Sequence, residues 1–225
     1  MASIKKKAKN HPKKEHILGK EIDLLEFKFE LRRQAFHLLL GLVTVTLFYY
    51  NVLITPIFMF LVLVFGFILS YIAKSHKIPV ISSLINFFER PDERTRFPGR
   101  GALFFTAGVL LVIELFPKDV AIVSILILAV GDSVSHIIGR YFGRTKNPFL
   151  ETEKLLEGTL AGSLVAFPIA VLFAPSIPWW HILLACFGAM FVEAIELEAN
   201  KREVDDNIIV PLAAGAILLL LRIYI

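Results

Sequence analysis

The amino-acid sequence predicts an all-α polytopic membrane protein with about seven transmembrane helices and a cytoplasmic N-terminus. Of its 225 residues, 56% are hydrophobic, and the mean hydropathy is +0.68. Soluble domains are only about 45–50% apolar. Apolar runs close to the ~20 residues needed to cross a bilayer recur along the chain. The positive charges fall between these runs in a one-sided pattern, which indicates an orientation.

Residues 1–34 are predicted to form a basic cytoplasmic tail followed by an interfacial helix. Residues 1–14 are polar, whereas residues 15–34 place Ile17, Ile22 and Phe29 among charged residues at near-helical spacing, as in helices that lie on a membrane surface. A basic tail before membrane spans favours contact with anionic lipid and an orientation signal over binding of nucleic acid. The tail lysines are Lys5, Lys6, Lys7, Lys9, Lys13, Lys14 and Lys20.

Residues 35–225 are predicted to form one transmembrane domain. Pro56, Pro117 and Pro175 mark the ends of apolar runs, where helix-breaking residues belong. The predicted spans are about 35–50, 54–73, 101–116, 119–139, 159–174, 179–198 and 207–225.

The distribution of Lys and Arg sets the predicted orientation. Of the 24 Lys and Arg residues, all but Lys118 and Arg222 lie in the tail or in the connections 74–100, 140–158 and 199–206. Since cytoplasmic loops carry the excess of positive charge, these connections are predicted to be cytoplasmic and the C-terminus to lie outside.

Asp132 is the first candidate site residue, because it lies inside a long apolar run. A charged side chain near the centre of a membrane helix costs roughly 2.5–3.5 kcal/mol on insertion scales, so it is a functional candidate by default. It could ligate a metal or act as a base. His136 shares its helix face, four residues on, but a packed histidine is the more common reading.

The loop after Asp132 is basic and contains glycines, as phosphate sites require. It supplies cations and backbone that a ligand can approach closely. The alternatives are a salt bridge between Lys154 and Glu157, and a close helix–helix contact at Gly158 and Gly162. The candidate phosphate residues here are Arg140, Gly143, Lys146, Lys154, Glu157 and Gly158.

Two further cytoplasmic stretches carry candidates. Before the third span, a Pro98-Gly99 turn lies among Arg96, Arg100 and Gly101, which fits either phosphate binding or an ordinary turn with positive charges. All these polar groups are predicted to lie on the cytoplasmic side of the membrane, where nucleotide is available.

Near the C-terminus, apolar sequence contains Glu193 and Glu196, and Asp205 and Asp206 precede the last span. Carboxylates suit a hard cation, although one aspartate could instead cap the helix.

The run Gly131-Asp132, Gly139-Arg140, Gly143-Arg144, Lys154 and Glu157-Gly158-Thr159 resembles the CTP-dependent lipid-alcohol kinases. This family includes dolichol and polyprenol kinases, phytol kinases and CTP-dependent diacylglycerol kinases. Three other pieces resemble it too: Arg32-Arg33 with His37, Phe97 to Ala102, and Glu193 with Asp205-Asp206-Asn207 and Pro211. The resemblance covers residues 32–211.

The resemblance implies an integral membrane kinase that transfers the γ-phosphoryl group of CTP, with Mg²⁺, to a lipid alcohol at the cytoplasmic face. Asp132, Lys154 and Asp205 would be catalytic, and Asp132, Asp205 and Asp206 would hold Mg²⁺. The other Arg, Lys, Glu and Gly candidates named above would contact the nucleotide.

One departure from the family pattern concerns the residue after Lys154. The family often has Ser or Thr there, whereas this chain has Leu155, with Glu153 in place of a second lysine. The family is also related to phosphatidate cytidylyltransferases, but their C-terminal Pro-Gly-His-Gly-Gly run is missing from this sequence. Transfer of a cytidylyl group is therefore the second hypothesis, and a transporter with buried proton- or cation-carrying acids is the third.

Overall fold

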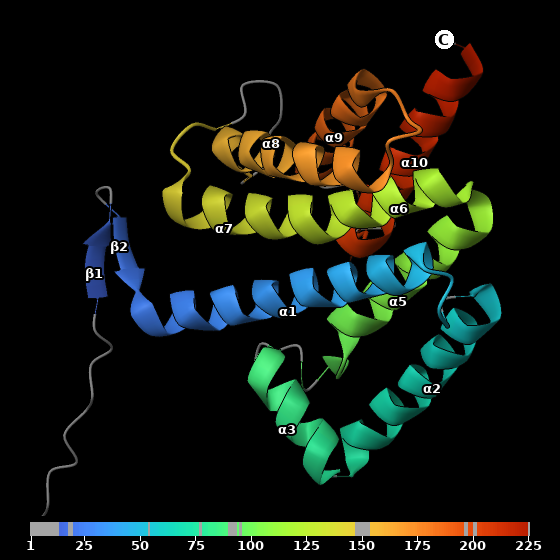
Figure 1. Ribbon diagram of the computed structural model, residues 1–225. Helices are drawn as coiled ribbons and strands as arrows, with labels where there is room; N and C mark the ends of the chain where they lie inside the picture. Colours follow the sequence, from blue (N-terminus) through green and yellow to red (C-terminus); the bar gives the residue numbers. More distant parts are fainter. Residues whose placement is uncertain are drawn as a thin grey trace, which may run out of the picture.

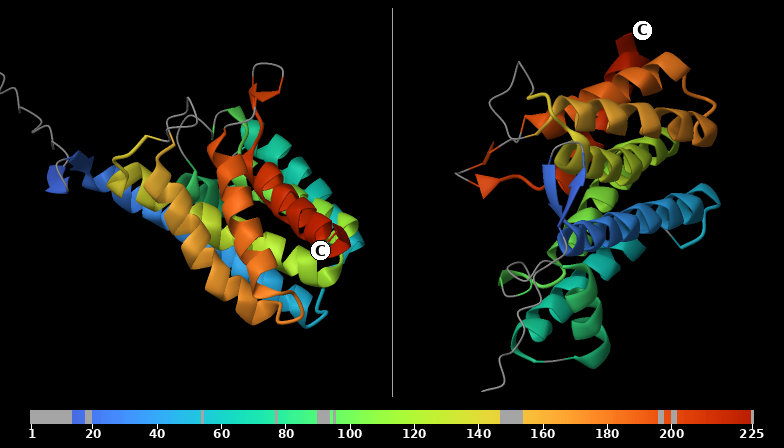
Figure 2. Two further views of the ribbon diagram at one scale, coloured as in Figure 1. Left: turned by 90° about the horizontal axis from the view of Figure 1, so that it is seen from above. Right: turned by 90° about the vertical axis from the view of Figure 1, so that its left-hand side faces the viewer.

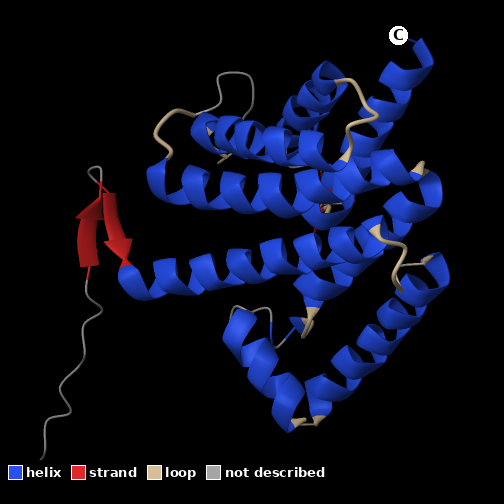
Figure 3. Cartoon of the chain, viewed as in Figure 1, coloured by secondary structure: helices blue, strands red, loops and turns tan. Residues whose placement is uncertain are grey.

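Helices form almost all of the structure in the computed structural model, which describes residues 14–17, 20–53, 55–76, 78–89, 94, 96–146, 154–195, 198–199 and 202–224 (Figures 1 and 3). Two small antiparallel hairpins lie at the edge of the helical bundle (Figure 2). The helices are α1 (Leu24–Tyr49), α2 (Pro56–Ser75), α3 (Pro79–Phe88), α5 (Arg100–Leu115), α6 (Lys118–Leu126), η1 (Ile127–Asp132), α7 (Ser133–Phe142), α8 (Leu156–Phe173), α9 (Trp179–Ala194) and α10 (Asp206–Tyr224). The strands are β1 (Lys14–Ile17), β2 (Lys20–Asp23), β3 (Glu198–Ala199) and β4 (Arg202–Glu203).

The centre of the fold is the continuous helical rod formed by α6, η1 and α7. It lies between α8 on one side and α1 on the other (Figure 1). Val123, Leu126 and Leu128 are fully buried, because this helix is apolar all round and is covered by other helices rather than by lipid. Its η1 segment is a π-helix that ends at Asp132. Such π segments occur often at functional sites.

The structure corrects the start of the interfacial helix predicted for residues 15–34, whose position at a membrane surface stays a prediction. Residues 14–17 pair with residues 20–23 as β1 and β2, and the helix begins only at Leu24. Gly19 and the β-branched Ile17 and Ile22 are poor helix formers, which accounts for the late start. From Leu24 the helix runs without a break through the predicted first span, so the polar residues 24–34 and the apolar residues 35–49 form one rod.

Helices occupy all seven predicted span positions, so the all-α membrane class is confirmed. Four helical segments are long and apolar enough to cross a membrane: Pro56–Ser75, Lys118–Phe142, Leu156–Phe173 and Asp206–Tyr224. Most of α2 is exposed apolar surface, including Ile57, Phe65 and Tyr71, as expected of a helix that faces lipid. The number of spans and the side of the N-terminus remain predictions. The short helix α3 lies within the predicted loop 74–100.

The first turn of α10 is fixed by a close crossing with α5. A Cβ atom on Gly108 would lie 2.0 Å from the carbonyl oxygen of Asn207. Pro211, four residues after Asn207, has no N–H to donate to that carbonyl, so the α10 backbone can approach Gly108 there. The crossing holds Asp205 and Asp206 beside the start of α5.

Candidate active site

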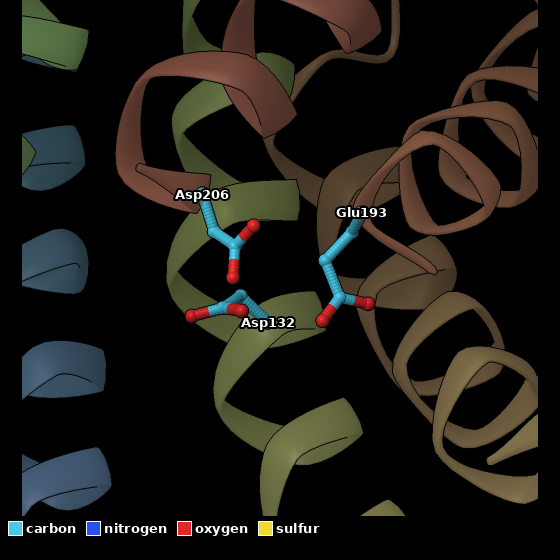
Figure 4. Close-up of side chains that lie close together, drawn as sticks. All are labelled: Asp132, Glu193 and Asp206. Atoms are coloured by element: carbon cyan, nitrogen blue, oxygen red, sulfur yellow. The ribbon is translucent and has the colours of Figure 1, made fainter. Parts of the chain in front are cut away.

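Three carboxylates from three different helices converge in the middle of the protein. Asp132 ends η1, Glu193 lies in α9, and Asp206 is the first residue of α10 (Figure 4). One oxygen of each lies within 4.8 Å of the others. The side chain of Glu193 is only 2% exposed, whereas that of Asp206 is 40% exposed. Asp206 also lies at a helix N-terminus, where the helix dipole favours negative charge.

Lys154 lies against this group of carboxylates from the loop before α8. Its Nζ donates to Oε1 of Glu193 and, at 3.0 Å, to Oδ2 of Asp206. Burial opposes the charge of the ammonium, but Glu193, Asp206 and Asp132 outweigh it and hold the pKa of Lys154 above its usual range. The other oxygen of Glu193 accepts from Ser135 Oγ at 3.1 Å. Both oxygens of the Glu193 carboxylate therefore accept hydrogen bonds.

Asp205 is oriented differently from its neighbour Asp206. Its Oδ1 accepts from the backbone N of Asn207 at 3.2 Å and from Asn207 Nδ2 at 2.7 Å, which is how a capping residue holds a helix start. Its Oδ2 lies 3.1 Å from Nη2 of Arg100 at the start of α5. Asp205 thus caps α10 and holds Arg100, while Asp206 joins Asp132 and Glu193.

A second polar cluster connects α1 with α7. Glu30 is almost completely buried, with its side chain 1% exposed. Its Oε1 accepts from Arg33 Nε at 2.8 Å and lies 2.9 Å from His136 Nε2. Further along α1, His37 directs Nε2 toward Asp132, 3.9 Å from Oδ2. This nitrogen is buried and has no hydrogen-bond partner within the described part of the chain.

Most of these groups line one cavity of about 380 Å³, although Glu193 and Glu30 are not among its lining residues. Its charged wall combines Arg33, Arg100 and Lys154 with the aspartates. Its apolar wall lies between α1 and α3, where the rings of Phe36 and Phe88 stack at 4.2 Å. The cavity can therefore hold an anion and a cation at one side and a hydrocarbon at the other.

Six of the predicted site residues line this cavity: Arg100, Gly101, Asp132, Lys154, Asp205 and Asp206. Two others belong to the turn before α5. Arg96 is exposed, and Gly99 adopts a left-handed backbone conformation (φ 80°) that favours glycine. The roles assigned to all these residues remain predictions.

The remaining predicted residues lie around the connection between α7 and α8. Arg140 pairs with Glu26 of α1, and Lys146 forms an isolated β-bridge with Leu155. Glu157 accepts from the backbone N and the hydroxyl of Thr145. Gly143 ends α7. The salt bridge considered between Lys154 and Glu157 is replaced by the bonds of Lys154 to Glu193 and Asp206.

Gly158 lies where the other alternative placed it, at a close helix contact. A Cβ atom on it would lie 2.6 Å from the carbonyl oxygen of Ser135 and 2.9 Å from the Cα of Gly139. The site is thus held by backbone contact between α7 and α8. The side chain of Glu196 and residue Asn200, which the sequence places after Glu193, lie outside the described part of the protein, as do residues 147–153 of the basic loop and the first 13 residues of the tail.

The sequence did not predict Glu30, Arg33, His37 or Glu193 as site residues. A signal existed for the first three, since Glu30, Arg33, Gln34 and His37 follow helical spacing on one face of α1. Glu193 was conspicuous as a carboxylate in apolar sequence. Only the tertiary structure brings it next to Lys154.

Comparison with known proteins gives the chain several relatives. It is 27% identical over 220 residues to a CTP-dependent diacylglycerol kinase of Schizosaccharomyces pombe, covering 86% of this chain and 94% of the yeast protein. It is 28% identical over 148 residues to a phytol kinase of Synechocystis, covering 64% of this chain and 60% of that protein. An uncharacterized protein of Methanocaldococcus jannaschii is 29% identical over 199 residues, covering 84% of this chain and 92% of its own length.

No family model and no solved structure matches the chain. Relatives of known activity include kinases of diacylglycerol and of phytol, which belong to the group of proteins that the sequence motifs resemble.

Proposed function

We propose that this chain, a homologue of the CTP-dependent diacylglycerol and phytol kinases, transfers the γ-phosphoryl group of CTP to the hydroxyl of a membrane lipid alcohol. The observation that carries the proposal is the group Asp132, Glu193 and Asp206. Two of its members, Asp132 and Asp206, line the same cavity as Lys154 and Arg100. Phosphoryl transfer depends mainly on positioning and on neutralisation of charge. This site offers carboxylates for a cation and cations for phosphates within one cavity.

The residues present fit Mg²⁺. Hard cations prefer oxygen ligands, and three carboxylates place one oxygen each within 4.8 Å of one another. No hydrogen bond engages the carboxylate of Asp132 within the described residues, so its oxygens are available. We assign Asp132, Glu193 and Asp206 as the residues that would hold the ion, in place of the predicted set with Asp205. Bound there, Mg²⁺ would neutralise charge on the phosphates.

The phosphates of CTP would contact the cationic side chains of the cavity. Arg33, Arg100 and Lys154 come from three different elements, and each is held by a carboxylate. Guanidinium groups suit phosphate because their donors form a planar fork. Arg33 and Arg100 would therefore orient the triphosphate, while Lys154 would supply a point charge next to the carboxylates.

The proton of the alcohol needs an acceptor in the same cavity. A carboxylate oxygen of Asp132 is the natural one, because it faces the cavity from the buried end of η1. His37 lies 3.9 Å away, and its ring nitrogen directed toward that oxygen has no hydrogen bond from the residues that the structure describes. The alcohol O–H would thus be positioned between Asp132 and the phosphoryl group that it attacks.

The hydrocarbon chain of the alcohol would leave through the apolar wall between α1 and α3. Phe36 and Phe88 stack at this wall. The neighbouring Phe87 opens onto a groove of about 530 Å³ on α3. An alcohol that enters from the bilayer along α3 would place its hydroxyl in the polar cavity without exposing its tail to water. Tail recognition by such apolar surface favours no single alcohol, so diacylglycerol, phytol and dolichol-type polyprenols all remain candidates.

Incubation of the purified protein with Mg²⁺, a panel of these lipids and either γ-labelled or α-labelled CTP would test the proposal. Label on the lipid from γ-labelled CTP only is the expected result. Label from α-labelled CTP would instead indicate the second candidate, a cytidylyltransferase. No transfer from either nucleotide to any lipid would contradict both activities and leave the transport hypothesis.

A further inference from the structure

We infer that Lys154 competes with the divalent cation for the carboxylates of the proposed metal site, so that the cation binds well only once a triphosphate draws Lys154 away. The inference rests on the metal site proposed above. It adds that Lys154 and the ion compete for the same oxygens. The triphosphate and the ion would therefore bind as interdependent ligands rather than independently.

The first step concerns which oxygens are free. Oε1 of Glu193 and Oδ2 of Asp206 accept from Lys154, and Oε2 of Glu193 accepts from Ser135. Within the described residues, the oxygens without a hydrogen bond are the two of Asp132 and the remaining one of Asp206. An ion that uses all three side chains must therefore approach an oxygen of Glu193 that already accepts from Lys154 or from Ser135.

The second step concerns charge. The ammonium of Lys154 contacts two of the three carboxylates and lies close enough to the third to be influenced by it. It already neutralises part of the negative charge that would attract a divalent cation. Glu193 is 2% exposed, and so water screens this interaction little. Lys154 consequently lowers the attraction of the site for Mg²⁺ when no nucleotide is bound.

The third step concerns what releases Lys154. Its side chain is 25% exposed, and it lines the cavity that also contains Arg33 and Arg100. A triphosphate in this cavity offers oxygens of higher charge than a carboxylate, at a site that Lys154 reaches from its loop. When Lys154 moves to phosphate, Oε1 of Glu193 and Oδ2 of Asp206 become available to the ion. The site would then admit the cation together with its nucleotide.

Binding of Mn²⁺ to the purified protein without nucleotide, measured by electron paramagnetic resonance, tests this competition. Lys154→Met removes the charge at similar length, so we expect its Mn²⁺ affinity to exceed that of the wild type by about tenfold or more. Lys154→Arg keeps the charge and should bind Mn²⁺ about as weakly as the wild type. Lys74→Met, which alters an exposed lysine at the end of α2, is the matched control and should not change the affinity.

The outcomes separate this inference from the proposed metal site. Equal or weaker Mn²⁺ binding by Lys154→Met would overturn the inference. If the Mn²⁺ affinity of Asp132→Asn equals that of the wild type, both with and without a non-hydrolysable CTP analogue, the proposed metal site itself is wrong.

Lys154→Met leaves Glu193 without its cation and could lose stability. Thermal unfolding therefore serves as a second readout. Mn²⁺ should raise the melting temperature of Lys154→Met more than that of the wild type. A smaller rise in the variant would also contradict the competition.

Discussion

Gly139 and Gly158 bring the backbones of α7 and α8 into contact: a Cβ atom on Gly158 would lie only 2.9 Å from the Cα of Gly139. The same atom would lie 2.6 Å from the carbonyl oxygen of Ser135, whose hydroxyl donates to Glu193. Backbone atoms cannot rotate away as a flexible side chain can. The spacing of these two helices therefore sets how close the start of α8, which follows Lys154, lies to Ser135, which contacts Glu193.

Gly158→Ala should lower the melting temperature and the kinase activity, because the new methyl group forces α7 and α8 apart. Overpacking of this kind typically costs about 1–3 kcal/mol. Gly101→Ala is the control for stability, since a Cβ atom there meets nothing within 4 Å. Equal melting temperatures for the two variants would show that the helices can separate freely.

The predicted orientation can be tested with single cysteines at two exposed serines. In a Cys186→Ala background, Ser75→Cys at the end of α2 should react with an impermeant reagent from the cytoplasmic side. Ser176→Cys, between α8 and α9, should react from the opposite side. The expectation follows from the distribution of Lys and Arg. The Cys186→Ala background removes the single cysteine of the sequence. The reverse labelling pattern would place the active site outside.

Asp205 and Asp206 should give different defects, although they are adjacent. Asp205→Ala removes the side chain that accepts from Asn207 and holds Arg100. We expect it to cost about 1 kcal/mol of stability with little change in the Mg²⁺ requirement. Asp206→Ala should raise the Mg²⁺ concentration needed for half-maximal activity, because it removes a proposed ligand. Identical Mg²⁺ titrations of the two variants would contradict this division.

Glu30→Gln should destabilise the protein and raise KM for CTP. It removes the buried charge on which Arg33 and His136 converge. Loss of a buried charged hydrogen-bond partner costs about 1–3 kcal/mol, and a less constrained Arg33 should contact phosphate less well. Glu26→Gln is the stability control, since Glu26 pairs with Arg140 at an exposed position, and such pairs contribute about 1 kcal/mol or less. If the KM for CTP of Glu30→Gln equals that of the wild type, Glu30 has only a structural role.

The sequence predicted the helices and singled out Asp132 as a candidate because both inferences depend on local physics. An apolar run of sufficient length forms a helix in a membrane, and a carboxylate within it needs compensation. Local sequence could not show which of Asp205 and Asp206 caps α10 and which joins the other carboxylates, since either residue could cap the helix. Only the crossing of α5 and α10 brings Arg100 to Asp205.

The contacts of the candidate site that could not be predicted join residues that are distant in sequence. Glu30 of α1 pairs with His136 of α7, and Lys154 pairs with Glu193 of α9. Local periodicity identifies the face that each residue occupies but not the helix that it meets. At the N-terminus, near-helical spacing of Ile17 and Ile22 was the misleading signal, because β-branched residues beside Gly19 favour a hairpin instead.

Asp132→Asn is the sharpest test of the mechanism. The change keeps the shape of the side chain but removes the charge that the proposed metal site and the alcohol proton both require, so turnover should fall by about a hundredfold or more. The fold should persist and gain stability, because a carboxylate that is costly in a membrane helix is replaced by a neutral amide.

Asp119→Asn is the matched control for this test. Asp119 lies in the first turn of the same helical rod and pairs with Arg222, 3.4 Å away, far along the chain from the cavity. Its replacement should leave turnover unchanged. Transfer of γ-label and thermal unfolding, measured for both variants over a range of Mg²⁺ concentrations, give the comparison. Near-normal transfer by Asp132→Asn at every Mg²⁺ concentration would make Asp132 a structural carboxylate, and catalysis would then have to be assigned to other residues.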